Sequence, residues 1–215
     1  MRLPHRVAVS SDPIASWWYF HGRDDVLRVV TSSFRVTEFL HRVRKLEAMT
    51  NAMPRGVFST LSAPSQTFFA DLSVTVGAPQ EVGSTGQGFR RLIPITGGSV
   101  VGDGWTANVL AGGADFQLVV SDRLALLDAR YCIQTDGGDL IYVKNRAVRS
   151  GPPELMAKLL RGELLDAAST ALIYFRCSPT FETASPALSW ITERMFTGTG
   201  ARHPNKVVMR FFALE

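Results

Sequence analysis

Polar side chains that could carry out chemistry occur two residues apart in stretches that otherwise resemble β-strands. Asp115 and Gln117 form one such pair, and Asp128 and Arg130 form another. Because side chains alternate between the two faces of a strand, residues two positions apart share a face. A carboxylate beside an amide or a guanidinium can exchange a proton or hold a polar group of a ligand. The pairs are therefore candidates for acid–base chemistry or for ligand binding.

Histidine usage argues against the commonest catalytic and metal centres. Of the four histidines, His5, His21 and His41 lie in the first 65 residues, which leaves His203 for the rest of the chain. A His-based zinc site, a Ser-His-Asp triad or a Cys-His pair would have to be built with this single histidine, which makes all three improbable. The glycine clusters also match no dinucleotide or phosphate loop. We therefore expect no metal and no cofactor.

The candidate pairs lie in a stretch from Gly112 to Pro153 that reads as a β-meander. Its three strand-like runs are Ala114–Val120, Leu124–Thr135 and Asp139–Val148. The connections between them are short, and either polar or rich in glycine, as antiparallel hairpins require. The middle run has one apolar face, with Leu127, Ala129, Tyr131 and Ile133, and one polar face, with Asp128, Arg130 and Gln134.

The period of the strand does not say which of these faces is inside. If the polar faces line a lumen, carboxylates, an amide and guanidinium groups meet a ligand there, and Trp105, Tyr131 or Trp190 forms its apolar walls. If they face solvent, the charges pair as ordinary surface ions between strands. Arg176, among apolar neighbours on a later strand, raises the same question. Both interpretations stay open at this point.

The remaining pattern of the chain predicts an all-β domain. Further strand-like runs are Phe68–Val76, Phe89–Val101, Trp105–Ala111, Thr170–Cys177, Met195–Gly198 and Lys206–Leu214. The last run is apolar on both faces, which suits a paired strand better than an open edge. Pairing the last strand with the first closes the sheet, so we predict a small antiparallel barrel. One short amphipathic helix over Pro152–Arg161 interrupts the strands, with an apolar face formed by Leu155, Met156, Leu159 and Leu160.

Residues 1–65 differ from the rest of the chain and are predicted to be a poorly ordered N-terminal extension or the result of a start codon placed too early; both are favoured over a targeting segment, which would contain fewer acids. They mix aromatic and charged residues without a sustained period, and Met49 and Met53 are alternative starts. The sequence pI is about 9.4. Residues 1–48 hold eight Lys/Arg against five acids, which leaves 15 basic and 14 acidic residues afterwards. This near balance disfavours nucleic acid as a partner of the barrel.

No apolar run approaches the roughly 18–20 residues that span a bilayer, and no secretory signal is recognisable. The two cysteines, Cys132 and Cys177, lie inside expected strands without metal-ligand or redox spacing, and buried free thiols are the expected state. We expect no membrane association.

Several motifs after the extension resemble, in order, those of the domain of unknown function 3237 family, also called uncharacterised protein family UPF0311. The runs are IPITGGSVVG (Ile93–Gly102), LAGGADFQLV (Leu110–Val119), LLDARYCIQTDGGDLIYVKNRAVRSGPPELM (Leu126–Met156) and YFRCSPTFETASP (Tyr174–Pro186). The resemblance covers about residues 66–215. It implies a small calycin-like (lipocalin-like) barrel, located in the cytoplasm, without an established activity.

The resemblance also implies a set of site residues. The motif positions are Asp115, Gln117, Asp128, Arg130, Tyr131, Asn145, Arg146, Arg176 and Glu182, and Trp190 begins a further motif. The chain departs from the family pattern at Phe116, where Trp is usual, at Ala184, where Gly is usual, and at Thr192, where Asn is usual. If that Asn touches the ligand in relatives, Thr192 changes the specificity.

We expect residues 66–215 to bind a small, partly apolar organic ligand in the lumen. The alternative is a cofactor-free isomerase, lyase or cyclase. In that case Asp115 or Glu182 acts as the general base, and Arg130 or Arg176 stabilises a developing oxyanion. A structural subunit with a filled core, and a homo-oligomeric assembly, also remain open.

Overall fold

The computed structural model describes residues 61–215, so the predictions for residues 1–60 lie outside the described residues. Residues Ala63–Glu215 form one compact unit. The strands are β1 (Gln66–Val76), β2 (Gln80–Thr85), β3 (Gly88–Gly102), β4 (Thr106–Val109), β5 (Ala114–Ser121), β6 (Leu124–Thr135), β7 (Leu140–Ser150), β8 (Tyr174–Thr183), β9 (Phe196–Arg202) and β10 (Lys206–Leu214). The helices are α3 (Pro153–Leu160), α4 (Ala167–Ala171) and the 3-10 helix η1 (Pro186–Thr192).

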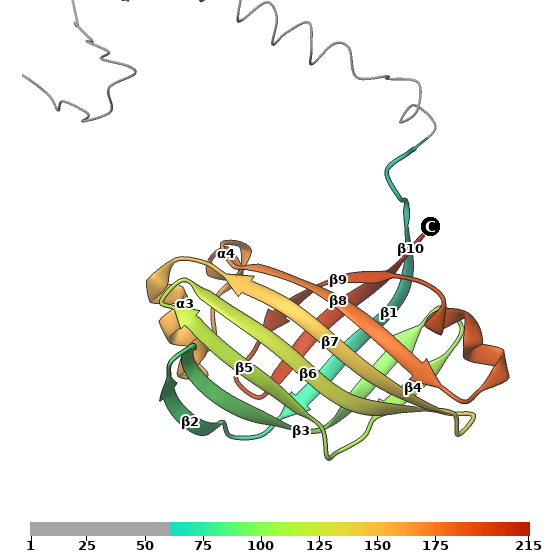
Figure 1. Cartoon of the computed structure of the whole chain (residues 1–215), viewed down its shortest axis with the longest axis horizontal. Coiled ribbons are helices and arrows are strands. Elements are labelled where there is room, and N and C mark those ends of the chain that lie inside the picture. The colour runs from blue at the N-terminus through green and yellow to red at the C-terminus, as the bar shows by residue number, and fades with distance from the viewer. Residues whose placement is uncertain (1–60) are drawn as a thin grey trace, which may run out of the picture. The chain divides into compact units, whose positions relative to one another are not determined.

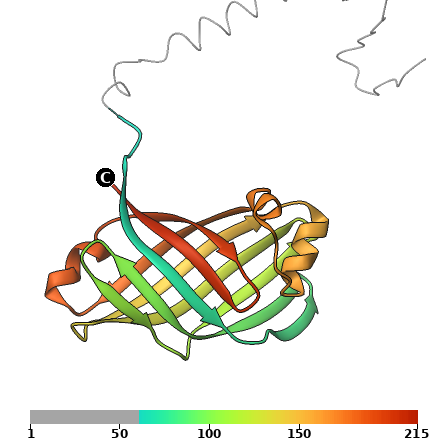
Figure 2. The same cartoon turned by 180° about the vertical axis from the view of Figure 1, so that it is seen from behind.

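The strands close into an antiparallel barrel, as predicted (Figure 1). Its order is β1, β10, β9, β8, β7, β6, then β4 and β5 in turn, then β3. β4 and β5 pair with different parts of β3 and β6, and β1 and β2 pair with different parts of β3. Each of these two pairs therefore occupies a single strand position in the barrel wall, so the wall has eight strand positions. The first and last strands close the wall, and they run side by side in Figure 2.

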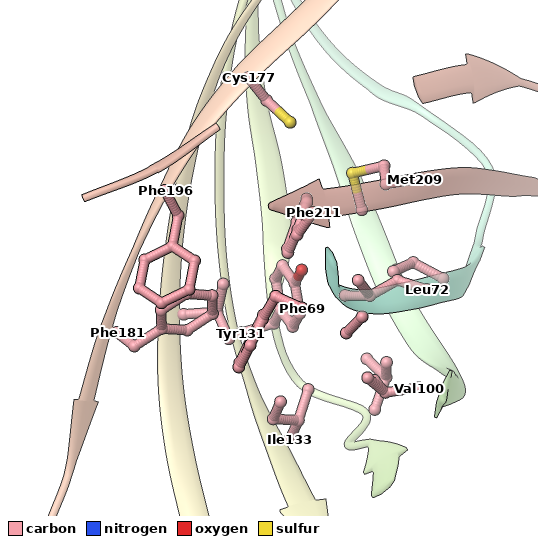
Figure 3. Close-up of a cluster of buried hydrophobic side chains, with 14 of the residues drawn as sticks. Phe69, Leu72, Val100, Tyr131, Ile133, Cys177, Phe181, Phe196, Met209 and Phe211 are labelled. Carbon is pink, nitrogen blue, oxygen red and sulfur yellow. The ribbon is translucent and has the colours of Figure 1, made fainter. Parts of the chain in front are cut away.

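The lumen is divided into two halves of different character. At one end the aromatic side chains of Phe69, Phe181, Phe196 and Trp105 fill the space, and Figure 3 shows three of these rings clustered. The rings of Phe69 and Phe196 are 4.8 Å apart between centroids, and Trp190 on η1 packs on Phe69 at 5.7 Å. This end is therefore closed by side chains.

At the other end, α3 packs over the barrel. Leu155, Met156 and Leu159 are buried with Ala125 and Leu165 in a second apolar cluster. Figure 1 shows α3 and α4 together at this end. The predicted buried face of the helix is confirmed at those three positions, whereas Leu160 is only half-buried.

Small residues on β9 leave room for large neighbours inside the barrel. A Cβ atom on Gly198 would lie 2.7 Å from the Phe211 ring and 2.8 Å from the Cys177 sulfur. A Cβ atom on Gly200 would lie 3.2 Å from the Phe175 ring. Glycine at these inward positions therefore allows the rings of β8 and β10 to occupy the lumen.

Two elements differ from the prediction. The strand expected from Thr170 begins at Tyr174, because Ala167–Ala171 forms α4, whose N-terminus is capped by the Asp166 side chain. The segment Gln80–Thr85 forms β2, where no strand was predicted. Within residues 61–215, none of the helices combines the length and the hydrophobicity that a membrane crossing requires.

Candidate functional site

A layer of buried polar side chains lies at the α3 end of the lumen. It contains Arg91 from β3, Gln117 from β5, Arg149 from β7 and Arg202 from β9, all at most 8% exposed. Asp115, two residues before Gln117 on the same face of β5, is partly buried and lines the same space. Alternation along four strands therefore places three guanidinium groups and one carboxyl group inside the barrel.

Part of this layer is fixed by a chain of hydrogen bonds. Arg91 Nε donates to Gln117 Oε1 at 3.0 Å, and Gln117 Nε2 donates to Asp115 Oδ2 at 2.7 Å. The backbone N–H of Asp128 donates to Asp115 Oδ1 at 3.1 Å. Arg91 Nη1 also donates to the Leu160 carbonyl at 2.7 Å, which ties the layer to the C-terminal end of α3.

The other two arginines retain unused donors. Within the described part of the chain, Arg149 Nε and both Nε and Nη1 of Arg202 are buried without a hydrogen-bond partner. Arg202 Nη2 donates to the Pro204 carbonyl at 3.2 Å. Neither guanidinium is within ion-pair distance of a carboxylate among residues 61–215. Buried donors without partners are costly, so an acceptor placed against these atoms would be bound favourably.

Two neighbouring cavities lie beside these arginines, the inner one lined by both and the outer one by Arg202. The inner cavity has a volume of about 40 Å³, and Asp115, Tyr131, Asn145, Arg149 and Arg202 are among its lining residues. The outer pocket has a volume of about 350 Å³. It lies between the gap from β1 to β2, the turn from β9 to β10 and the end of α3. Both are lined by Val76 and Arg202, so the outer pocket and the inner cavity are neighbours on either side of these residues.

The deep side of the inner cavity carries a second set of unpartnered polar atoms. The Tyr131 hydroxyl and Asn145 Oδ1 are buried and have no hydrogen-bond partner among the described residues. Asn145 Nδ2 donates to the Met209 sulfur at 3.3 Å. Figure 3 draws Tyr131 and Met209 among the buried side chains of the main apolar cluster. Asn145 and Arg149 lie four residues apart on the same face of β7, so unpartnered polar atoms line the cavity at two levels, together with apolar side chains.

Burial shapes the electrostatics of the layer. It raises the pKa of Asp115, and the hydrogen bond from Gln117 and the charge of Arg149 only partly oppose this. Burial lowers the pKa of Arg149 to about 10, and it lowers the pKa values of Arg91 and Arg202 as well. Three cations face one carboxyl group with a raised pKa, so the lumen carries a net positive charge.

The structure places four of the predicted site residues in the lumen. Asp115, Gln117, Tyr131 and Asn145 all line the inner cavity. They come from three neighbouring strands, β5, β6 and β7.

The predicted lumen position of Asp128 and Arg130 is wrong. They form an ion pair at 3.1 Å on the outer surface, where their side chains are 32% and 47% exposed. The opposite face of β6, with Leu127, Tyr131 and Ile133, is buried. The apolar face gains more from burial, whereas the charged pair remains hydrated outside.

Arg176 and Glu182 also lie outside the lumen. Arg176 donates to the Thr199 hydroxyl at 3.1 Å and lies over the Tyr174 ring. Glu182 accepts a hydrogen bond from Lys144 at 2.6 Å. Both residues alternate with buried neighbours on β8, which is why they face outward.

Trp190 and Thr192 belong to the closed end of the barrel. Trp190 is 42% exposed on η1 and lines neither cavity. The Thr192 hydroxyl donates to the Ser189 carbonyl at 2.8 Å. Phe116 is exposed on the outer face. None of these side chains contributes to the polar layer.

Sequence reasoning missed Arg91, Arg149 and Arg202. A signal existed for Arg149, because it continues the alternation that buries Val143, Asn145 and Ala147 on β7. Among residues 61–215, no group of three or more His, Cys, Asp or Glu side chains is arranged to hold a metal ion.

Fold and site define a closed antiparallel β-barrel with one end filled by aromatic side chains and one polar, accessible end. The chain belongs to the family of proteins of unknown function DUF3237, whose profile matches residues 64–214. It is 43% identical over 138 residues to a UPF0311 protein of Rhodopseudomonas palustris, covering 64% of this chain and 88% of that protein.

Solved structures show the same fold. A conserved protein of unknown function from Rhodopseudomonas palustris matches with a TM-score of 0.67 and 37% identity, over 72% of this chain and 99% of that one. A β-barrel-like protein from Acinetobacter baumannii matches with a TM-score of 0.63 and 34% identity, over 73% and 99%. A structure described as an enzyme from Penicillium herquei matches with a TM-score of 0.54 and 20% identity, over 73% and 98%.

Proposed function

We propose that the barrel binds a small, partly apolar organic anion in its lumen, with the anionic group held by Arg149 and Arg202. The observation that supports this most directly is the set of buried guanidinium donors without partners on these two residues. A carboxylate or enolate presents acceptor oxygens that match such donors and supplies the missing negative charge.

The surroundings fit an organic ion better than a bare inorganic one. The inner cavity is walled by apolar side chains, including Val74, Ile95 and Leu127. An outer pocket of about 350 Å³ falls within the usual range for small-molecule sites. The apolar part of the ligand would bury its surface there, while its anionic group reaches the arginines.

Calorimetric titration tests the proposal with two acids and their neutral amides, hexanoate with hexanamide and phenylacetate with phenylacetamide. We expect at least one acid to bind and its amide to bind at least about tenfold more weakly, because the charge-assisted hydrogen bonds are lost. Arg149→Met should abolish binding of the acid.

The matched control is Arg210→Met, because Arg210 is exposed and pairs with Asp71 outside the lumen. This variant should bind the acid as the wild type does. Equal affinity for acid and amide, or binding that survives in Arg149→Met, would contradict the proposal.

A second candidate function is cofactor-free catalysis by isomerisation, elimination or cyclisation. Burial raises the pKa of Asp115, as a general base near neutral pH requires, and its position in the lumen supports the role. Arg149 or Arg202 would stabilise a developing oxyanion, in place of the surface residues Arg130 and Arg176. The likeness to the Penicillium herquei enzyme concerns the fold alone, so Asp115 carries this candidate.

We further propose that the protein acts in the cytoplasm. Cys132 and Cys177 are both free, and they lie on different strands with different burial. Free thiols in these positions suit a reducing compartment.

A further inference from the structure

The inner cavity carries a polar pair that the proposed anion site does not use. The Tyr131 hydroxyl and Asn145 Oδ1 lie among apolar side chains, at 2% and 3% exposure of their residues. Neither atom has a hydrogen-bond partner among the described residues. The amide nitrogen of Asn145 donates one hydrogen bond to the Met209 sulfur, whereas its oxygen accepts none.

The two atoms require hydrogen-bond partners of opposite kinds. Asn145 Oδ1 can only accept a hydrogen bond, so it requires a donor. The Tyr131 hydroxyl can donate, and burial raises its pKa, so it keeps its proton. A hydroxyl group both accepts and donates, so a hydroxyl placed between the two atoms would satisfy both, whereas a methyl or methylene group would leave both unpaired.

The position of the pair relative to the arginines sets the shape of the ligand. Asn145 precedes Arg149 on the same face of β7. Four residues of strand correspond to about 13 Å between backbone positions at roughly 3.3 Å per residue, and the long arginine side chain shortens that span. The inner cavity of about 40 Å³ accepts only a slender segment. The hydroxyl must therefore sit several bonds away from the anionic group, on an unbranched part of the ligand.

We propose that the ligand is a hydroxy acid, with its carboxylate at Arg149 and Arg202 and its hydroxyl between Tyr131 and Asn145. This inference rests on the proposed anion-binding function and specifies its ligand class. Any bulkier part of the molecule lies in the outer pocket, beside Pro79 and the end of α3.

The test compares matched probes on the wild-type chain by calorimetric titration. The pairs are 4-hydroxybutanoate with butanoate, 5-hydroxypentanoate with pentanoate and 6-hydroxyhexanoate with hexanoate. In at least one pair the hydroxy acid should bind about tenfold tighter, as expected for two additional hydrogen bonds to groups that are otherwise unpaired.

Two conservative variants locate the effect. Tyr131→Phe removes only the hydroxyl oxygen and should reduce the affinity of the hydroxy acid to near that of its plain partner. Tyr142→Phe is the matched control, because Tyr142 lies on the outer face of β7, where Lys144 is close to its ring. This control should preserve the difference.

The outcomes separate the two proposals. If plain and hydroxylated acids bind equally well and Arg149→Met abolishes both, the anion site stands and the hydroxy-acid inference is overturned. If a difference exists but survives in Tyr131→Phe, the hydroxyl binds elsewhere and the inference is also overturned. If no acid of either kind binds, the proposed function fails and the inference fails with it.

Discussion

The buried charge of Arg149 lowers the free energy of unfolding of the protein without a ligand. Its side chain is buried with an unpartnered Nε, and burial lowers its pKa to about 10. A base whose pKa is lower in the folded state destabilises that state wherever it remains protonated. The penalty is therefore present at neutral pH and disappears as the pH rises above both the folded and the unfolded pKa.

Replacing this charge with an apolar side chain should stabilise the fold. We predict that Arg149→Met raises the free energy of unfolding by about 1–4 kcal/mol at pH 7, because the methionine keeps much of the stem and removes a buried charge. Urea denaturation measures this change. Arg130→Met serves as the control, since Arg130 is exposed, and it should leave the midpoint unchanged. Destabilisation by Arg149→Met would mean that the guanidinium contributes structural contacts.

Asp115 should tune the anion site with pH. Burial raises its pKa above the ordinary value of 3.8, so protonation begins at a higher pH than for an exposed aspartate. The protonated form no longer repels a bound anion. We predict that affinity for hexane-1-sulfonate, which stays ionised, increases as the pH falls from 8 through the raised pKa of Asp115, and levels off below it.

Asp115→Asn removes that titration. The variant should bind the sulfonate about tenfold tighter at pH 8, since a like charge is removed from a buried site, and its affinity should no longer increase on acidification. Its free energy of unfolding should increase less than that of Arg149→Met. The single amide oxygen of the new asparagine cannot accept well from both Gln117 and the Asp128 N–H. If the wild type and the variant show the same pH profile, Asp115 does not face the anion. If the protein is an enzyme, this variant should also lose turnover.

Four of the residues predicted for the candidate site do line the lumen. Asp115, Gln117, Tyr131 and Asn145 could be found because family motifs and strand alternation select them. The three buried arginines could not be separated from surface arginines by type, since most arginines are exposed. Arg130 was misplaced because spacing shows which residues share a face, whereas the position of that face in the barrel depends on strand pairing.

The helix α3 is the element that covers the open end of the lumen. We predict that Leu159→Ala lowers the free energy of unfolding by about 2–5 kcal/mol, because Leu159 is buried against the end of the barrel and its truncation leaves a cavity. Denaturation midpoints measure the effect. The neighbouring Lys158→Ala is the control, as Lys158 is exposed on the same helix. An unchanged midpoint in Leu159→Ala would show that α3 is not part of the folded core.

Strands β5 and β6 could be predicted from the local pattern of the sequence, whereas α4 and β2 could not. The strands β5 and β6 begin where alternation and turn residues indicated, and β6 buries alternate residues, with Ala125, Leu127, Tyr131 and Ile133 inside. The short helix α4 was missed, since it depends on a single cap by Asp166 and buries none of its residues. β2 was missed because its side chains are mostly exposed and only its pairing with β3 defines it.

The barrel should fold without the N-terminal extension. Residues Ala63–Glu215 form a compact unit, and the family profile begins at residue 64. We predict that a protein lacking residues 1–52 unfolds cooperatively, with a thermal midpoint close to that of the full chain. Parallel thermal melts of both forms provide the measurement. Loss of a cooperative transition in the short form would show that the removed residues contribute to the core.

Closure of the barrel was predictable from the ends of the domain. β10 is apolar on both faces, and it pairs along its length with β1, so neither strand is left as an open edge. The division of the lumen was not predictable in this way. It depends on which inward positions of distant strands meet, such as Arg91 with Gln117 and Val207 with Arg202, and that pairing is a property of the whole register.

The proposed function requires that the buried arginines hold an organic anion. Native mass spectrometry of the full chain, gently purified from its own host, tests it directly, with Arg130→Met and Arg149→Met prepared in the same way. We predict an additional mass, identified after release as a small organic acid, on the wild type and on Arg130→Met, and none on Arg149→Met. A wild type that carries no such acid, or one retained equally by all three proteins, would contradict the account.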